Sequence, residues 1–162
     1  MIILFDLDNT VFTTRDKYGN HIWAKQLIEP FSLHCDGDME FITDDVGSVC
    51  SLLPEVKTVI HSLSKAGKRI GYISNGKAMA LHDDQQPSKI ILQLFQLSHC
   101  FNECQILQYK TSSKAELIRS LYGQQKCLVI DDDDRHIGEL VNMGIQVIDI
   151  KSIKLSMVNF DV

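Results

Sequence analysis

The order in which strand and helix patterns follow one another constrains the fold of this chain more than any other feature. Short apolar runs, which predict buried strands, alternate with segments whose apolar residues recur at helical spacing. The expected strands cover residues 2–5, 69–73, 105–108, 127–130 and 145–150, and the expected helices begin near residues 54, 87, 113 and 135, with one short helix after residue 150. This alternation is typical of a parallel sheet with helices on both faces. We therefore predict an α/β fold, a three-layer αβα sandwich around a doubly wound, mostly parallel five-stranded sheet.

Several residues mark where the helices begin and end. Pro54 stands at a first helical turn, where proline is accepted, and Gly67 follows the last residue of that pattern. Ser113 with Glu116 three residues later is a capping-box pattern. Gly144 is expected to cap the last long helix. These signals place the helices between the predicted strands.

The segment between the first strand and the first long helix breaks the alternation. Two β-type runs, residues 11–16 and 21–24, flank a Gly-Asn turn and predict a hairpin flap. Residues 27–50 show no clean period and contain six acids without one lysine or arginine, which predicts a loop-rich acidic insertion. We therefore expect one domain, residues 1–162, in which the insertion at 11–50 leaves little or no cap over the site.

Length and charge limit the class of protein. The chain has 162 residues and a mass of 18.4 kDa, the usual size of one domain. Sixteen basic residues against 21 acidic ones give a net charge of -5, which argues against nucleic-acid or membrane partners. For the oligomeric state, we favour a monomer. Met1 leads directly into a strand without a signal-peptide pattern, so we expect a cytoplasmic protein, with export lacking a cleavable signal as the alternative.

The cysteines bear on both the compartment and metal binding. Five cysteines, odd in number and scattered, are typical of reduced thiols. His99 and Cys100 with Cys104 suggest zinc, but no second ligand pair at structural-zinc spacing accompanies them. The sequence therefore favours buried thiols over a zinc site.

Polar groups gather where the predicted strands end. They are Asp6 and Asp8, Ser74 and Asn75, Lys114, and Asp131 with Asp132. Because the carboxyl ends of parallel strands meet at one edge of a sheet, we expect these groups to lie together. Clustered carboxylates repel one another unless a cation lies among them, and hard oxygen ligands favour Mg²⁺. Lys114 stands in a first helical turn, where the helix dipole disfavours a cation, so an anion is expected nearby.

The ordered motifs resemble the haloacid dehalogenase (HAD) superfamily of phosphotransferases over nearly the whole chain. Asp-Leu-Asp-Asn-Thr at 6–10 matches the first motif, Ile-Ser-Asn at 73–75 the second, Lys114 the third and Val-Ile-Asp-Asp at 129–132 the fourth. The segments 53–56, 94–97 and 131–137 look most like the magnesium-dependent phosphatases of that superfamily. Asn75 and His136 depart from that subgroup, which tends to have arginine and asparagine there. The resemblance implies a HAD-like Rossmannoid fold.

The resemblance also implies the chemistry of the first motif. Asp6 would attack phosphorus and become an aspartyl phosphate, and Asp8 would protonate the leaving oxygen and later deprotonate the attacking water. Thr10 would orient the turn. The expected enzyme is a Mg²⁺-dependent phosphomonoester hydrolase.

The other motifs supply ligands and charge. Mg²⁺ would be held by the Asp6 carboxylate, the Asp8 backbone carbonyl and Asp131, with Asp132 acting directly or through water. The phosphoryl oxygens would be held by Ser74, the Asn75 amide and Lys114.

The substrate is the least defined part of the prediction. An open site would admit a phosphorylated protein side chain, phosphotyrosine among them, or a small phosphate ester such as a sugar phosphate. Trp23 could stack on a substrate ring or pack in the hairpin, and residues 82–84 could reach substrate or form an acidic loop. The alternatives are a non-catalytic metal-binding interaction domain of the same fold and transfer to an acceptor other than water. Taken alone, residues 131–134 could also be a solvated loop, with Asp133 and Asp134 outside the site.

Overall fold

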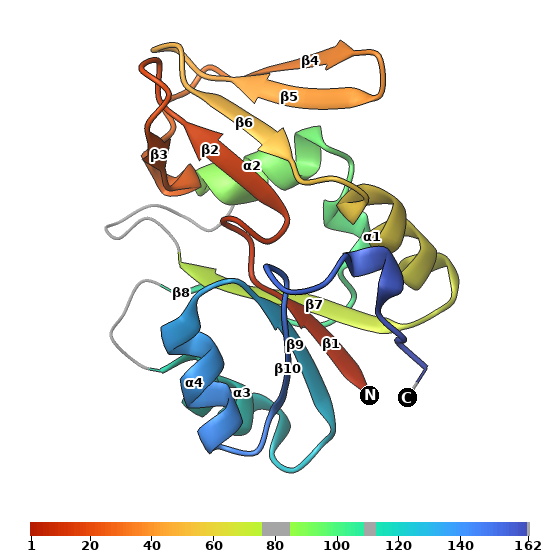
Figure 1. Cartoon of the computed structure of the whole chain (residues 1–162). Helices are drawn as coiled ribbons and strands as arrows, with labels where there is room; N and C mark the ends of the chain where they lie inside the picture. The colour runs from red at the N-terminus through yellow and green to blue at the C-terminus, as the bar shows by residue number, and fades with distance from the viewer. Residues whose placement is uncertain (76–84, 109–112, 162) are drawn as a thin grey trace.

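A computed structural model describes residues 1–75, 85–108 and 113–161 of the chain. The protein is a mixed α/β molecule with one parallel and one antiparallel sheet, each of five strands (Figure 1). The parallel strands are β1 (Ile2–Phe5), β7 (Arg69–Asn75), β8 (Gln105–Gln108), β9 (Cys127–Asp131) and β10 (Gln146–Asp149). The α-helices are α1 (Val56–Lys65), α2 (Pro87–Leu94), α3 (Lys114–Tyr122) and α4 (Asp134–Asn142). The predicted α/β class and the five-stranded parallel sheet are confirmed.

The strand order of the parallel sheet determines where a ligand can bind. The order is β10-β9-β1-β7-β8, so the chain extends the sheet on one side of β1 and then returns to build the other side. The crevice at such a reversal, outside the carboxyl ends of the strands, is the usual ligand site of open α/β sheets. Phe5 of β1 lies opposite Ile130 of β9. Asp6 and Asp131, the next residues along the chain, therefore lie at the same height at the carboxyl ends of these two neighbouring strands.

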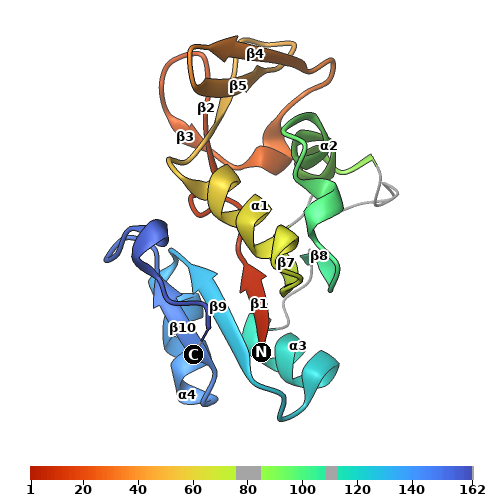
Figure 2. The ribbon, with the colours of Figure 1, turned by 90° about the vertical axis from the view of Figure 1, so that its right-hand side faces the viewer.

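Alternate residues of β1 point into two different apolar clusters. Ile3 and Phe5 pack in a cluster that contains α1 and α2 residues, such as Ile60. Ile2 and Leu4 pack in a second cluster with residues of α3 and α4. In Figure 2, α1 lies above β1 and below the strands that follow β1, whereas α3 and α4 lie near the end where both termini are. Because successive side chains of a strand point to opposite faces, helices are buried against both faces of the sheet.

The insertion after β1 is a sheet, and the prediction of a loop over residues 27–50 is wrong. Its strands are β2 (Phe12–Arg15), β3 (His21–Ile22), β4 (Ser32–Asp36), β5 (Met39–Thr43) and β6 (Val49–Leu52), in the order β3-β2-β6-β5-β4. The hairpin of β2 and β3 is confirmed by the pairing of Thr14 with Ile22. The sequence does carry a signal for β4 and β5: Leu33 and Cys35 alternate with polar residues, and Gly37-Asp38 is a two-residue turn between Asp36 and Met39.

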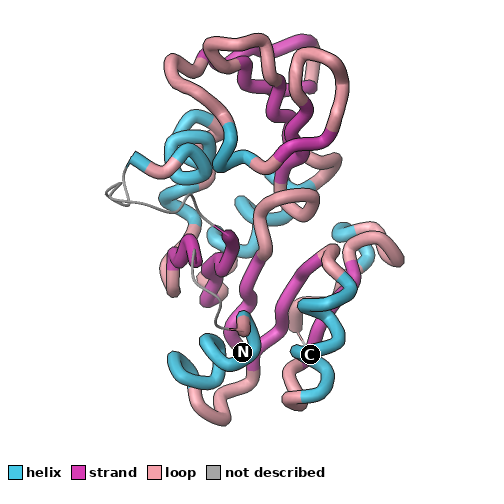
Figure 3. Tube along the Cα trace, turned by 90° about the vertical axis from the view of Figure 1, so that its left-hand side faces the viewer, coloured by secondary structure: helices cyan, strands magenta, loops and turns pink. Residues whose placement is uncertain are grey.

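The insertion sheet also corrects the expectation of little or no cap. It lies beyond the carboxyl-terminal tip of β1, at the end of the molecule opposite the termini (Figure 3). A short 3₁₀-helix, η1 (Ala24–Gln26), joins β3 to β4 and packs against α2. The insertion is thus a folded part of the domain that stands over the predicted ligand edge.

Part of the acidic charge in the insertion is structural. The buried Asp44 carboxylate accepts hydrogen bonds from the backbone N–H groups of Ile28 at 3.0 Å, Val46 at 3.0 Å and Ser48 at 2.8 Å. Glu40 forms an ion pair of 2.7 Å with Lys57 of α1. Asp44 therefore fixes a turn, and Glu40 ties the insertion sheet to a helix.

The remaining helix predictions are confirmed with two corrections, of which the first is that Pro54 precedes α1, since that helix begins at Val56 after the N-cap Glu55. The Ser113 hydroxyl accepts a hydrogen bond of 3.3 Å from the backbone N–H of Glu116, as a capping box requires. A 3₁₀-helix, η4 (Leu155–Met157), is the predicted short helix of the tail. Asp133 precedes α4 as its N-cap, outside any helix or strand, whereas Asp134 is the first helical residue, so the prediction of a loop is wrong for Asp134 only.

One prediction cannot be compared with the structure, because residues 82–84 lie outside the described residues. Across the described ranges, no helix combines the length and the apolar content that a membrane crossing needs.

The five cysteines are free thiols.

Substitution of Gly71 by alanine is expected to destabilise the protein by about 2–3 kcal/mol. A Cβ atom at Gly71 would lie 2.5 Å from the backbone oxygen of Cys104, which the paired strands hold in place. The matched control is Gly138→Ala on α4, where a Cβ meets no atom within 4 Å and alanine should gain about 0.5–1 kcal/mol. Urea unfolding of both variants measures the difference, and equal stabilities would contradict this close approach.

Candidate metal and phosphate site

Three carboxylates converge at the reversal point of the parallel sheet. Asp6, Asp131 and Asp132 each offer an oxygen, and these oxygens lie within 4.8 Å of one another. We call these residues the carboxylate group. Asp6 follows β1, while Asp131 ends β9 and is fully buried. Residues more than 120 positions apart therefore meet as the sequence predicted, because parallel strands end together at one edge.

Lys114 neutralises part of the carboxylate group. Its Nζ lies 3.0 Å from Asp6 Oδ1 and 2.6 Å from Asp131 Oδ2, and its side chain is 4% exposed. Lys114 is the first residue of α3, so the two carboxylates offset the unfavourable interaction of its charge with the helix N-terminus. The predicted anionic neighbour of this lysine is thus Asp6 with Asp131.

Backbone N–H groups hold Asp131 in a fixed orientation. Its Oδ1 accepts hydrogen bonds from the N–H of Asp132 at 2.8 Å and from that of Asp133 at 3.0 Å. His136 Nδ1 lies 3.4 Å from Asp131 Oδ2. No role was predicted for His136, although its place in the first turn of α4, five residues after Asp131, is a signal that could have indicated this contact.

Thr10 bridges two members of the carboxylate group, as predicted for a residue that orients the turn. Its hydroxyl donates to Asp132 Oδ1 at 3.3 Å and lies 3.5 Å from Asp6 Oδ2. The chain turns directly after β1, because the N–H of Thr10 and that of Val11 both donate to the carbonyl of Leu7. Asn9 adopts a positive φ of 61° within this turn, a conformation that asparagine tolerates better than most residues.

The Asp8 carboxylate is hydrogen-bonded to the insertion. Its Oδ1 accepts a hydrogen bond of 2.9 Å from the backbone N–H of Ala24, and the residue is buried. The Asp8 side chain lies outside the carboxylate group. The metal ligand predicted for this residue is its backbone carbonyl. The sequence did not identify Ala24, because a backbone donor leaves no trace in residue types.

The predicted phosphate ligands on β7 are only partly described. Ser74 is buried near the carboxyl end of β7, the strand next to β1. Asn75 is the last residue of that strand, and its side chain lies outside the described part of the structure.

Burial and mutual repulsion shift the ionisation of these acids. Burial raises the pKa of Asp6, and the charge of Asp131 raises it further while Lys114 opposes the change. Burial and the charges of Asp6 and Asp131 raise the pKa of Asp132 to about 7. Burial alone would raise the pKa of Asp131, but His136 and Lys114 lower it to about 2. The lowered pKa keeps Asp131 ionised, whereas the raised pKa values of Asp6 and Asp132 disfavour their ionised forms.

The donor set suits a hard divalent cation. Three carboxylates face one buried ammonium, so the fully ionised group has more negative charge than Lys114 can balance. Oxygen ligands of this kind select ions such as Mg²⁺ over softer metals. A bound cation would relieve the repulsion that now raises the pKa of Asp6 and that of Asp132.

Removal of the Asp8 charge is expected to change how stability depends on pH. Burial raises the pKa of Asp8 to about 6, against about 4 in an unfolded chain, so the folded protein binds the proton more tightly between these values. Ionisation of Asp8 therefore destabilises the metal-free wild type as the pH rises from 4 to 7. The Asp8→Asn variant, whose amide oxygen can still accept from Ala24, should gain about 2–3 kcal/mol relative to wild type over that range.

Urea unfolding in the presence of a chelator, at several pH values, measures this difference. Asp134→Asn is the control, because that side chain is 88% exposed and should show no comparable gain. If the difference in free energy of unfolding between wild type and Asp8→Asn stays constant from pH 4 to pH 7, Asp8 ionises normally in the folded protein.

Comparison with known proteins adds no family to these observations. The chain matches no protein-family model and no curated protein. The geometry of the carboxylate group is therefore the basis for a functional proposal.

Proposed function

We propose that this protein is a Mg²⁺-dependent phosphomonoester hydrolase that works through an aspartyl-phosphate intermediate on Asp6. The observation that carries the proposal is the carboxylate group at the sheet reversal, with the buried Lys114 Nζ 3.0 Å from Asp6 Oδ1. A nucleophilic carboxylate, a cation site and a fixed ammonium are the parts that phosphoryl transfer requires. Their order along the chain is that of the HAD-like motifs, and the proposed fold is the corresponding three-layer Rossmannoid sandwich.

In the first step, a carboxylate oxygen of Asp6 attacks phosphorus, and the bond from phosphorus to the ester oxygen breaks. Asp8 donates its proton to that leaving oxygen. A pKa of about 6 leaves Asp8 able both to hold and to release a proton near neutral pH. The products of this step are the free alcohol and phosphorylated Asp6.

In the second step, water attacks the phosphorylated Asp6, and Asp8 accepts the proton of that water. The bond from phosphorus to the Asp6 oxygen breaks, which releases inorganic phosphate and restores both acids. Lys114, buried beside Asp6, balances the charge that develops on the phosphoryl oxygens, with Ser74 and the Asn75 amide as further donors.

The carboxylates of Asp6, Asp131 and Asp132 and the Asp8 carbonyl would hold Mg²⁺. The ion, when bound, supplies charge that screens the nucleophile from the phosphate. Asp131 already accepts two backbone N–H groups and the Lys114 ammonium, so Asp6 and Asp132 retain the larger share of unused lone pairs. Thr10 keeps those two side chains together.

We propose a phosphorylated aromatic group, such as a phosphotyrosine side chain, as the substrate. An open site without a cap does not support this choice, because the insertion is a folded sheet. A different observation supports it: Trp23 is 50% exposed and directly precedes Ala24, whose N–H holds Asp8. The half-exposed ring is the part of the insertion that we propose to stack on the substrate. Small esters such as sugar phosphates are the second candidates, because the insertion could enclose them.

A panel of phosphate esters tests both parts of the proposal. Phosphotyrosine peptides, sugar phosphates and nucleotides are compared by kcat/KM with Mg²⁺ and with a chelator. We expect turnover only with Mg²⁺ and the highest kcat/KM for the aromatic ester. Absence of turnover on every ester would favour the rival interpretation, a metal-binding interaction domain, and a nucleotide preference would overturn the substrate assignment.

A further inference from the structure

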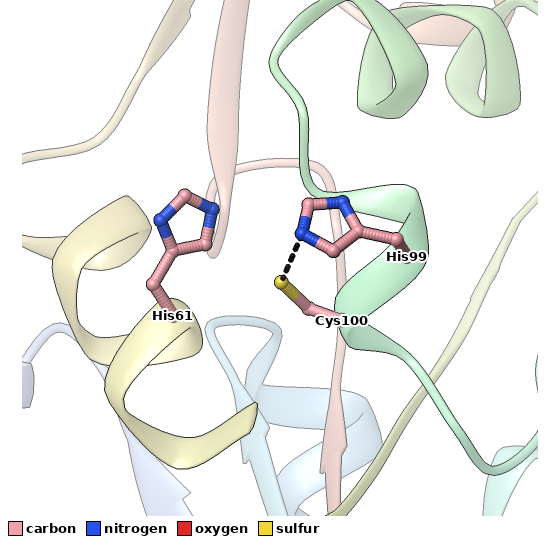
Figure 4. A group of neighbouring side chains, drawn as sticks. All are labelled: His61, His99 and Cys100. Atoms are coloured by element: carbon pink, nitrogen blue, oxygen red, sulfur yellow. Dashed lines mark hydrogen bonds between the residues drawn. The ribbon is translucent and has the colours of Figure 1, made fainter. Parts of the chain in front are cut away.

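A second group of metal-ligating side chains lies on the helices that cover the parallel sheet. His61 of α1 faces His99 and Cys100 of the 3₁₀-helix η3 (Ser98–Cys100), and Figure 4 shows the three side chains pointing toward one another. Each offers one ligand atom, and these atoms lie within 4.8 Å of one another. We call these residues the histidine–cysteine group. None of them belongs to the carboxylate group.

The separations in this group approach those of a tetrahedral zinc centre. His99 Nε2 lies 3.6 Å from Cys100 Sγ. Zinc bonds of about 2.05 Å to nitrogen and about 2.3 Å to sulfur, at a tetrahedral angle, place those two atoms about 3.6 Å apart. The same geometry places two nitrogen ligands about 3.4 Å apart, so His61 has to approach by no more than about 1.4 Å.

The burial of the three side chains fits a bound ion with access from solvent. Cys100 is 2% exposed, whereas His99 is exposed and His61 is partly exposed. His61 also lines a cavity of about 520 Å³ between the β4–β5 hairpin and α1. The sulfur is thus shielded while the imidazoles remain reachable, and among the described residues no fourth His, Cys, Asp or Glu joins the group. A water molecule would complete a tetrahedral set.

We propose that the histidine–cysteine group is a Zn²⁺ site, with His61, His99 and Cys100 as ligands. Thiolate and imidazole favour zinc over Mg²⁺, which the carboxylate group prefers. From the sequence, Cys104 was a candidate zinc ligand. The Cys104 Sγ instead lies 3.8 Å from the carbonyl oxygen of Tyr72 and outside the histidine–cysteine group. The missing partner is His61, which is 38 residues from His99 in sequence and next to it in space.

Zinc binding requires two proton movements. The Cys100 thiol, whose pKa burial raises, releases its proton on coordination. His61 Nε2 lies 3.1 Å from the carbonyl of Gln96, so ligation through Nε2 replaces that contact and leaves the ring proton on Nδ1. Because its ligands come from α1 and η3, the ion would fasten these two elements together and raise the stability of the folded chain.

Titration of the metal-free protein with Co²⁺ tests the site, because a thiolate bound to tetrahedral Co²⁺ gives an intense charge-transfer band. We expect one Co²⁺ per chain with this band, displacement by Zn²⁺, and a rise in Tm when Zn²⁺ is added. Cys100→Ser should abolish the band. His61→Ala and His99→Asn should each weaken Co²⁺ binding by about 100-fold or more, since even loss of a residue that only supports a ligand costs 10–100-fold.

Matched controls separate this site from other metal binding. Cys35→Ser and His21→Asn alter an exposed cysteine and an exposed histidine and should leave the band unchanged. The band should also persist in Asp6→Asn, which keeps this proposal independent of the phosphatase proposal. A wild-type protein without the band, or a band that survives in both His61→Ala and His99→Asn, would overturn the zinc site even if Cys100→Ser fails to fold.

Discussion

Asp6→Asn is expected to lower the Mg²⁺-dependent phosphatase rate by about 10⁴-fold or more, because the amide cannot form the aspartyl phosphate. Asparagine has nearly the shape of aspartate, so the turn after β1 should be kept. Burial and the charge of Asp131 already disfavour the ionised form of Asp6, since both raise its pKa. A neutral side chain there should therefore leave the metal-free protein folded, and the lost activity will report chemistry.

Single-turnover and steady-state assays on the best ester of the panel measure this loss. Asp134→Asn is the matched control, since it removes the charge of an acid that is 88% exposed at the start of α4. That variant should keep the wild-type rate. If Asp6→Asn folds and still hydrolyses the ester at the rate of the control, the nucleophile lies elsewhere.

Lys114→Met is expected to destabilise the Mg²⁺-free protein by about 3–5 kcal/mol, the usual cost of removing one partner from a buried ion pair. Methionine fills much of the same volume but leaves Asp6 and Asp131 without the ammonium that bonds to both. The lysine is buried, so water cannot replace its charge. Mg²⁺ should restore part of the stability, because a cation among the carboxylates reduces the same repulsion.

Urea unfolding with a chelator and with Mg²⁺ measures both effects. Lys154→Met, at an exposed position, should change stability by no more than about 0.5 kcal/mol. In the double variant Lys114→Met with Asp6→Asn, one of the two facing carboxylates is gone, so part of the lost stability should return. Equal stabilities for Lys114→Met and wild type would show that the buried pair contributes nothing to folding.

The parallel sheet and the carboxylate group could be predicted from the sequence for one reason. The strand segment Ile2–Phe5 is buried throughout, as is Cys127–Asp131, so each reads as an apolar run that ends at acids. Parallel pairing then places the ends of both strands at one edge, which brings Asp6 to Asp131. The anionic neighbour of Lys114 could also be predicted, because the effect of the helix dipole depends only on where a residue stands in its own helix.

Only the first hairpin of the insertion was predicted. Leu33 and Cys35 alternate with polar residues and Gly37-Asp38 forms the turn to Met39–Thr43, but the strand Ser32–Asp36 is exposed along its whole length and contributes no buried apolar run. Its acids look like solvent-facing charge, but Asp44 satisfies three backbone N–H groups. The donor to Asp8 is the backbone of Ala24, which any residue type could have supplied.

The sequence by itself determined the strand ends, the order of the polar groups and the acidic character of the candidate metal site, because these follow from local burial patterns and from the geometry of parallel strands. Only the tertiary structure decided that residues 32–52 extend the predicted hairpin into one sheet over that edge and that His61 lies beside Cys100. Contacts between distant segments depend on how helices and sheets pack, and that packing leaves no periodic signal in the chain.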